Sequence, residues 1–131
     1  MSSVFSKIIN RKLPAYIIYE NDDFIAFLDV TPIQKGHVLV VPKLEIDNVF
    51  DLPLDVYNGL FSFARKISFG MKKVFDCKRI GISIIGFEVP HAHIHLIPIN
   101  TIDDMNFKNK KSIKSDEMKL TARKISRSIE F

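Results

Sequence analysis

The stretch His91-Ala-His-Ile-His-Leu-Ile-Pro98 sets a histidine at every second position of a strand-like run. Side chains of a β-strand alternate between the two faces of a sheet, with a rise of ~3.3 Å per residue. His91, His93 and His95 are therefore expected on one face, and the apolar residues between them should point into the core. The run predicts a strand with chemistry on one face and packing on the other.

Patterns on both sides of this run predict the remaining elements. Apolar residues recur at spacings of three and four from Leu54 to Phe75, which is typical of one long amphipathic helix. Short helices are expected over residues 5–10 and 118–129. Strands are expected over residues 16–19, 24–29, 36–41, 80–85 and 92–97. The sequence thus predicts an α+β fold, in which a meandering, mostly antiparallel sheet of about five strands packs against the long helix.

Capping residues and strand composition refine this expectation. Asp51, ahead of Pro53, suits the N-cap of the long helix, and Ser115 suits the N-cap of the C-terminal helix. The strand over residues 36–41 is almost wholly apolar. A strand of this kind is expected at the centre of the sheet, covered on both faces.

Length and charge indicate one domain over residues 1–131, with a core over 4–100 and a basic segment over 101–131. Residues 106–131 hold eight Lys or Arg against three Asp or Glu, so this part has a net charge of +5, whereas the whole chain has +4. Such a segment could contact a phosphate backbone. No aromatic residues are interleaved with the basic ones, so a solvated helix face is favoured and nucleic acid is not an expected partner.

The chain has the features expected of a cytoplasmic protein. No apolar run approaches the ~20 residues that a membrane span needs, and the N-terminal residues do not resemble a signal peptide. No membrane partner is therefore expected. The single cysteine, Cys77, has no second cysteine with which to form an internal disulfide, and it is expected to serve in packing.

Two kinds of chemistry suit the histidine cluster. Neutral imidazole is nucleophilic near pH 7, so His93 could attack phosphorus while the other histidines, His37 included, orient it and neutralise phosphate oxygens. Alternatively, three imidazoles could bind a metal such as zinc. Metal hydrolases usually add a carboxylate, and only Glu88 lies close in sequence. A regular strand would point Glu88 away from the histidines.

The sequence resembles the histidine-triad (HIT) superfamily, whose signature is His-φ-His-φ-His-φ-φ with φ apolar. Residues 91–97 match it at every position, with Ala92 as a small φ. Further segments match in the same order over about residues 4–100, among them Phe24-Ile-Ala-Phe-Leu-Asp29 and Gly36-His-Val-Leu-Val-Val-Pro-Lys43. The resemblance implies a HIT-like fold that forms a homodimer, with the two sheets joined into one.

The resemblance also implies hydrolysis or transfer at the α-phosphate of a purine nucleotide. His93 would be the nucleophile, held by the backbone carbonyl of His91, while His95 and His37 would lie at the phosphate. The family's nucleotide contacts would fall on Asp29 for the ribose, on Phe5, Ile9, Phe27 and Val30 for the base, and on the backbone N–H groups of Glu88 and Val89 for the phosphate. No cofactor or metal is implied.

The chain departs from the family at two places. Many bacterial relatives have zinc-binding cysteines where this chain has Ser3 and Ser6, so no structural zinc is expected. Phe87 stands where a glutamine is usual, in a shorter loop.

The favoured activity is hydrolysis of nucleoside phosphoramidates or aminoacyl adenylates. A dinucleoside polyphosphate hydrolase, a weakly active nucleotide-binding module and a metal-dependent hydrolase remain alternatives.

Overall fold

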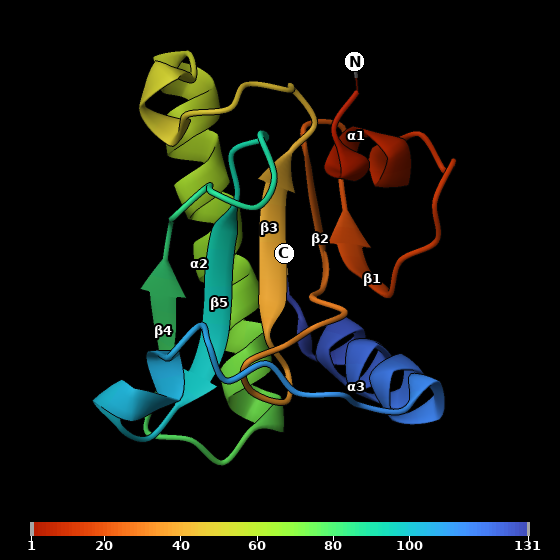
Figure 1. The fold of residues 1–131 in the computed structure, drawn as a ribbon, viewed down its shortest axis with the longest axis vertical. Coiled ribbons are helices and arrows are strands. Elements are labelled where there is room, and N and C mark those ends of the chain that lie inside the picture. The colour runs from red at the N-terminus through yellow and green to blue at the C-terminus, as the bar shows by residue number, and fades with distance from the viewer. Residues whose placement is uncertain (1, 131) are drawn as a thin grey trace.

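A computed structural model describes residues 2–130 of the chain. In this described part, five antiparallel strands form one sheet in the order β1-β2-β3-β5-β4. The strands are β1 (Ile17–Glu20), β2 (Phe24–Leu28), β3 (Val38–Pro42), β4 (Arg79–Ser83) and β5 (Ile94–Ile99). The predicted α+β class is confirmed, but the sheet meanders only as far as β3. The chain then crosses through a helix to the edge strand β4 and returns as β5 beside β3 (Figure 1).

Within residues 2–130, three α-helices and two short 3-10 helices complete the fold. The α-helices are α1 (Val4–Ile9), α2 (Leu54–Val74) and α3 (Ser115–Ser128), and the 3-10 helices are η1 (Val49–Asp51) and η2 (Ile102–Met105). Both predicted N-caps are wrong. Asp51 belongs to η1, and Ser115 is already the first residue of α3. Neither long helix has a side-chain cap, because Pro53 and Lys114 occupy the N-cap positions.

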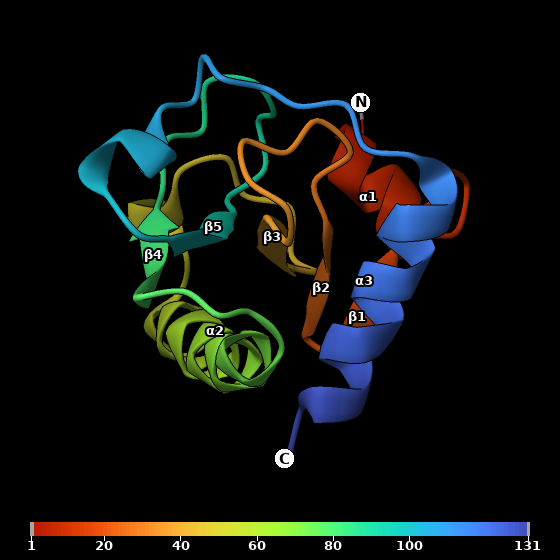
Figure 2. The ribbon, with the colours of Figure 1, turned by 90° about the horizontal axis from the view of Figure 1, so that it is seen from below.

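Alternation along the strands divides the core into two layers. Side chains such as Ala26, Val40 and Ile94 join the larger cluster, which α2 and α3 cover. Ile25 and Leu39, which point the other way, join a smaller cluster under α1. Figure 2 shows α2 below the sheet and α3 along its right-hand side. Every residue of β2 and β3 is buried, as expected for central strands.

The face that α1 covers only in part is the one that carries the histidines. His95 pairs with Leu39 in the β3–β5 register, so both side chains point to the same side of the sheet. The backbone of this face is fixed by buried strands, which makes it a rigid base for a site. Within residues 2–130, no helix is both long and apolar enough to cross a membrane.

Candidate functional site

The three histidines of the triad lie together, although only His95 belongs to a strand. β5 begins at Ile94, two residues later than predicted, and His91 and His93 are the last residues of the loop that follows β4. All three side chains are buried. The ring centroids of His93 and His95 are 4.8 Å apart, and the Phe5 ring lies 4.9 Å from that of His93. Ala92 and Ile94 point into the larger core cluster, as the alternation predicts.

His91 is fully buried and connects helix α1 to the triad. Its Nε2 donates to the backbone carbonyl of Pro42 (2.8 Å), so its Nδ1 is free to accept from the hydroxyl of Ser3 (2.7 Å). The Ser3 oxygen also accepts from the backbone N–H of Ser6, and thereby caps α1. Ser3 thus caps α1 and donates to the tautomer of His91 that the Pro42 carbonyl fixes.

A carboxylate missed by the sequence analysis completes this network. Glu45 accepts hydrogen bonds from the Ser6 hydroxyl (2.6 Å) and from the backbone N–H of Ser3 (2.7 Å). These two hydrogen bonds lower the pKa of Glu45 to about 2, and the bond from Ser6 makes the larger contribution. In sequence, Ser3 and Ser6 stand out only because they replace the zinc-binding cysteines of many bacterial relatives. Their contact with Glu45 joins segments 42 or 39 residues apart, which no local pattern reveals.

His93 is held with one ring nitrogen turned toward a cavity. Its Nδ1 donates to the backbone carbonyl of His91 (2.7 Å), which leaves the lone pair on Nε2. Burial lowers the pKa of His93 below its usual 6.5, with a smaller opposing contribution from the hydrogen bond to His91. A neutral imidazole with a fixed tautomer and an unprotonated nitrogen facing a cavity can act as a nucleophile or bind a metal.

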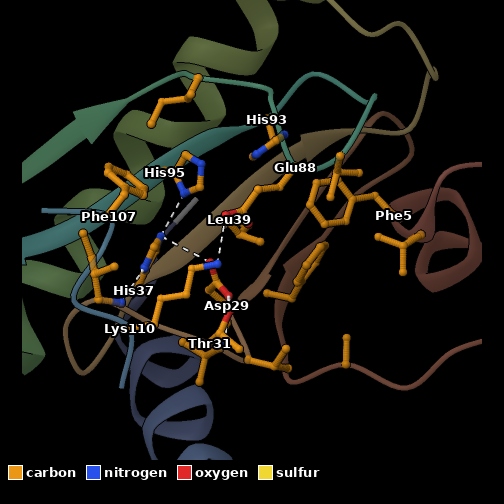
Figure 3. A pocket seen from close by; sticks show the side chains of 18 of the residues that line it. Phe5, Asp29, Thr31, His37, Leu39, Glu88, His93, His95, Phe107 and Lys110 are labelled. Carbon is orange, nitrogen blue, oxygen red and sulfur yellow. Dashed lines mark hydrogen bonds and ion pairs between the residues drawn. The ribbon is translucent and has the colours of Figure 1, made fainter. Parts of the chain in front are cut away.

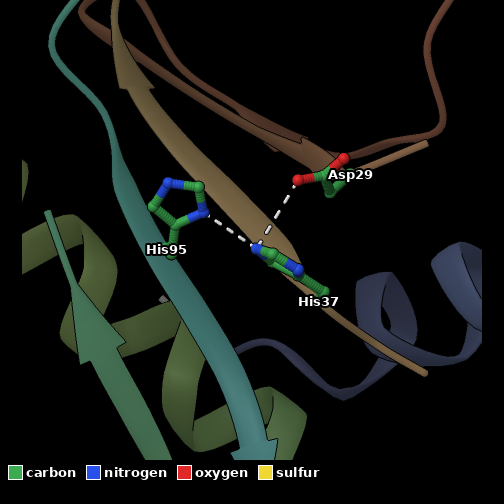
Figure 4. Close-up of side chains that lie close together, drawn as sticks. All are labelled: Asp29, His37 and His95. Carbon is green, nitrogen blue, oxygen red and sulfur yellow. Dashed lines mark hydrogen bonds and ion pairs between the residues drawn. The ribbon is translucent and has the colours of Figure 1, made fainter. Parts of the chain in front are cut away.

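His37 orients His95 through a chain of hydrogen bonds (Figure 4). The backbone N–H of Ile33 donates to Nδ1 of His37 (3.1 Å), so the proton of His37 is on Nε2. This proton is donated to Nδ1 of His95 (2.9 Å), which leaves an N–H on Nε2 of His95. Burial lowers the pKa of His37 to about 4. Burial, together with His93 and His37, lowers the pKa of His95 to about 3. Both rings are therefore neutral at pH 7.

The same two histidines and Asp29 form the one group among the described residues with metal-ligand geometry. One ligand atom from each lies within 4.8 Å of the others, and Asp29 Oδ2 is 3.6 Å from His37 Nε2. The proton shared by His37 and His95 would have to leave before a cation could bind between them. The donor set of two imidazoles and a carboxylate is suited to zinc.

A cavity of about 480 Å³ opens in front of His93 and His95. Figure 3 shows Phe5 at one end and His37, Phe107 and Lys110 at the other, with Glu88 between them. Most of the residues expected to contact a nucleotide line it. They are Phe5, Phe27, Asp29, Val30, His37, Glu88, Val89, His93 and His95. Ile9 is not among the lining residues and packs beside the smaller core cluster, whereas Ile8 lines the cavity.

The position of Glu88 differs from that expected for a regular strand. Residues 84–93 form a loop, so strand parity does not apply, and Glu88 lines the same cavity as His93. The segment after η2 also reaches the cavity, with Phe107, Lys108 and Lys110. Phe107 packs edge-on against His95, at 4.9 Å between ring centroids. These residues belong to the basic segment, for which the sequence predicts only a solvated helix face, because no local pattern indicates where the segment returns.

Comparison with known proteins places the chain among histidine-triad proteins. Residues 10–102 match the family model of the HIT domain. A HIT-like protein of Borreliella burgdorferi is 34% identical, with 96% of this chain and 97% of that protein aligned. The adenosine 5′-monophosphoramidase of Saccharomyces cerevisiae is 31% identical over 72% of this chain and 61% of its own length. The crystal structure of a Hit-like protein from Bartonella henselae superposes with a TM-score of 0.86 and 28% identity, covering 98% of this chain and 96% of the other.

Proposed function

The chain belongs to the HIT domain family, and we propose on that basis that it cleaves purine nucleotides at the α-phosphate through a nucleotidyl-histidine intermediate. The observation that carries the proposal is the geometry of His93. Its Nδ1–H is bound to the carbonyl of His91, so the nucleophilic Nε2 faces the cavity. The yeast relative is named adenosine 5′-monophosphoramidase. This name supports nucleoside phosphoramidates as the substrate class, and aminoacyl adenylates are close analogues of them.

In the first step, Nε2 of His93 attacks the α-phosphorus and the bond from phosphorus to the leaving nitrogen or oxygen breaks. The leaving group departs with the electron pair, and an amine takes its proton from water. The imidazole of His93 becomes a cation, which the carbonyl of His91 stabilises through Nδ1–H. In the second step, water attacks phosphorus and the bond to His93 breaks, which gives the nucleoside monophosphate and restores the neutral ring.

Charge that develops on the phosphate oxygens needs fixed donors. The Nε2–H of His95 is one, because His37 occupies the other ring nitrogen. The backbone N–H groups of Glu88 and Val89 are proposed as further donors, since both residues line the cavity. Asp29 is proposed to bind the ribose hydroxyls. One of its oxygens, Oδ1, accepts from the backbone N–H of Thr31 (2.9 Å), which fixes the carboxylate in the cavity wall.

The base is proposed to lie against the apolar end of the cavity. Phe5, Ile8, Phe27 and Val30 line this end, and a flat aromatic ligand fits such a surface. Phe5 and Phe27 contact each other edge-on, with centroids 5.5 Å apart, and so hold each other in position.

The deciding experiment is turnover of adenosine 5′-phosphoramidate in the presence of EDTA, by the unaltered protein and by His93→Ala. Formation of AMP by the unaltered protein alone is expected. Binding of AMP to both proteins is the control for an intact pocket. A rate that EDTA abolishes and zinc restores would favour the metal-dependent alternative at Asp29, His37 and His95. Binding of AMP by both proteins without turnover would favour a nucleotide-binding module, and turnover of a dinucleoside polyphosphate alone would favour the corresponding hydrolase.

We also propose a homodimer formed through β4. This strand is an edge of the sheet, and its Ile82 side chain is half exposed, with Ile84 and Ile85 exposed in the adjoining loop. An exposed edge with apolar side chains is suited to pairing with a second copy. Antiparallel pairing of two β4 strands would join the two sheets into one.

A further inference from the structure

Residues 106–111 form a strap that crosses the cavity of its own chain. The backbone N–H of Lys111 donates to the carbonyl of Pro32 (2.7 Å), and its ammonium donates to the carbonyl of Ile33 (3.0 Å). Nearer the start of the strap, the side chain of Gln34 donates to the carbonyl of Asp104 (3.1 Å). These bonds tie the strap to the β2–β3 connection, beside His37.

Lys110 extends from the strap across the cavity to the opposite loop. Its ammonium contacts Glu88 Oε1 at 2.8 Å, and both side chains remain well exposed (Figure 3). Ion pairs of this kind add little to stability, so the pair can open without loss of the fold. Glu88 therefore holds Lys110 over the cavity, and the Lys110 ammonium can exchange Glu88 for another anion.

The basic residues of the cavity lining lie on the strap. Lys108 and Lys110 line the cavity together with the carboxylates of Glu88 and Asp29, so these four charges sum to zero. Asp29 is bound to Thr31 and lies beside His37, whereas Glu88 pairs with Lys110. His37 and His95 are neutral. An anion that replaces Glu88 at Lys110 would have both strap lysines as partners in the cavity wall.

We infer that Lys110, with Lys108, binds the leaving group of the substrate and selects leaving groups that carry a negative charge, such as the carboxylate of an amino acid or a phosphate chain. This inference rests on the proposed function. With the base at the Phe5 end and phosphorus at His93, the leaving group is proposed to lie at the end formed by His37, Phe107 and Lys110, next to Glu88. Glu88 holds Lys110 in position until the anion replaces it.

The test compares two phosphoramidates of AMP that differ in one group, one made with glycine and one with glycinamide. Their kcat/KM ratio is measured for the unaltered protein, for Lys110→Gln and for Lys114→Gln. Lys114 lies beyond the strap and outside the cavity lining, so its variant controls for the loss of one charge. Comparing ratios between proteins cancels the intrinsic reactivity of the two amines.

Lys110→Gln is expected to lower the glycine-to-glycinamide ratio of kcat/KM about tenfold, which corresponds to the free energy of one hydrogen bond to a charged group. Lys114→Gln should leave the ratio unchanged, and Glu88→Gln should raise it because Lys110 is then unpaired. An unchanged ratio in Lys110→Gln, with both substrates turned over, would overturn the inference but leave the proposed function intact. The absence of turnover of either substrate by the unaltered protein would instead refute the proposed function. Diadenosine tetraphosphate, assayed with the same variants, distinguishes a phosphate chain from a carboxylate as the anion.

Discussion

The protons of the site are positioned by backbone groups. His91 donates to the carbonyl of Pro42, His93 donates to that of His91, and His37 accepts from the N–H of Ile33. A backbone partner cannot change its role as donor or acceptor, so each neutral ring has one tautomer. His95 obtains its tautomer indirectly, through His37. The unprotonated nitrogen of His93, Nε2, is therefore determined before any ligand binds.

Removal of the Ser3 hydroxyl should lower stability and loosen His91. Ser3→Ala leaves α1 without its N-cap and Nδ1 of His91 without its donor, in a buried position. The expected loss is about 1–3 kcal/mol in the free energy of unfolding. Urea denaturation measures it, with Ser2→Ala, at an exposed neighbouring position, as the control. Equal stabilities of the two variants would show that the Ser3 bond contributes nothing.

At the scale of elements, the residues just before β3 and just after α2 are in direct contact. Gly36 has φ +85°, and a Cβ built on it would overlap the ring of Phe75, which follows α2. Gly86, in the loop before the triad, has nearly the same φ of +82° but nothing within 4 Å of such an atom. The two glycines share a backbone requirement and differ in packing alone.

Gly36→Ala and Gly86→Ala should therefore differ in their effect on stability. The left-handed backbone costs any residue other than glycine about 1–2 kcal/mol, which both variants should lose. Gly36→Ala should lose about 1–3 kcal/mol more, because the added methyl group displaces Phe75. Thermal or urea denaturation of both variants measures this difference. A Gly36→Ala variant as stable as Gly86→Ala would contradict the close contact.

At the scale of the whole molecule, burial of several histidines ties stability to pH. Folding lowers the pKa of His37 to about 4 and that of His95 to about 3, from 6.5. Between these values and 6.5 the unfolded chain binds more protons than the folded one. Stability is thus fully present above pH 6.5 and falls as the pH drops toward 4.

The free energy of unfolding should therefore be lower at pH 5 than at pH 7, by about 1–2 kcal/mol for each of these two histidines. Urea denaturation at both values of pH tests this, in a range where few carboxyl groups titrate. In the double variant His37→Gln/His95→Gln, the free energy of unfolding should depend less on pH between 5 and 7. A stability that rises toward pH 5 would refute the neutral state of the buried rings.

The proposed dimer gives a second test at this scale. Ile82→Lys would place like charges opposite each other across two paired β4 strands, so it should shift the protein to monomers. Ile102→Lys, at a fully exposed position of η2, is the matched control. Size-exclusion chromatography with light scattering measures the mass of each. A monomeric unaltered protein, or a dimer that Ile82→Lys leaves intact, would reject pairing through β4.

The sequence by itself determined the elements of the fold and the group of histidines. Period-2 alternation placed Ala92 and Ile94 in the core opposite the histidines, and spacings of three and four located α2, because burial of one face imposes these local periods. Helix starts were less predictable, because the chain directions around Pro53 and Lys114 depend on packing.

Only the tertiary structure decided how the histidines are oriented and what closes the cavity. The bonds from Ser3 to His91 and from His37 to His95 join residues 88 and 58 positions apart. The strap brings Lys110 to Glu88 after β5 and η2 have reversed the path of the chain. No local pattern encodes such contacts, since they depend on which strands pair and on where the connecting segments return.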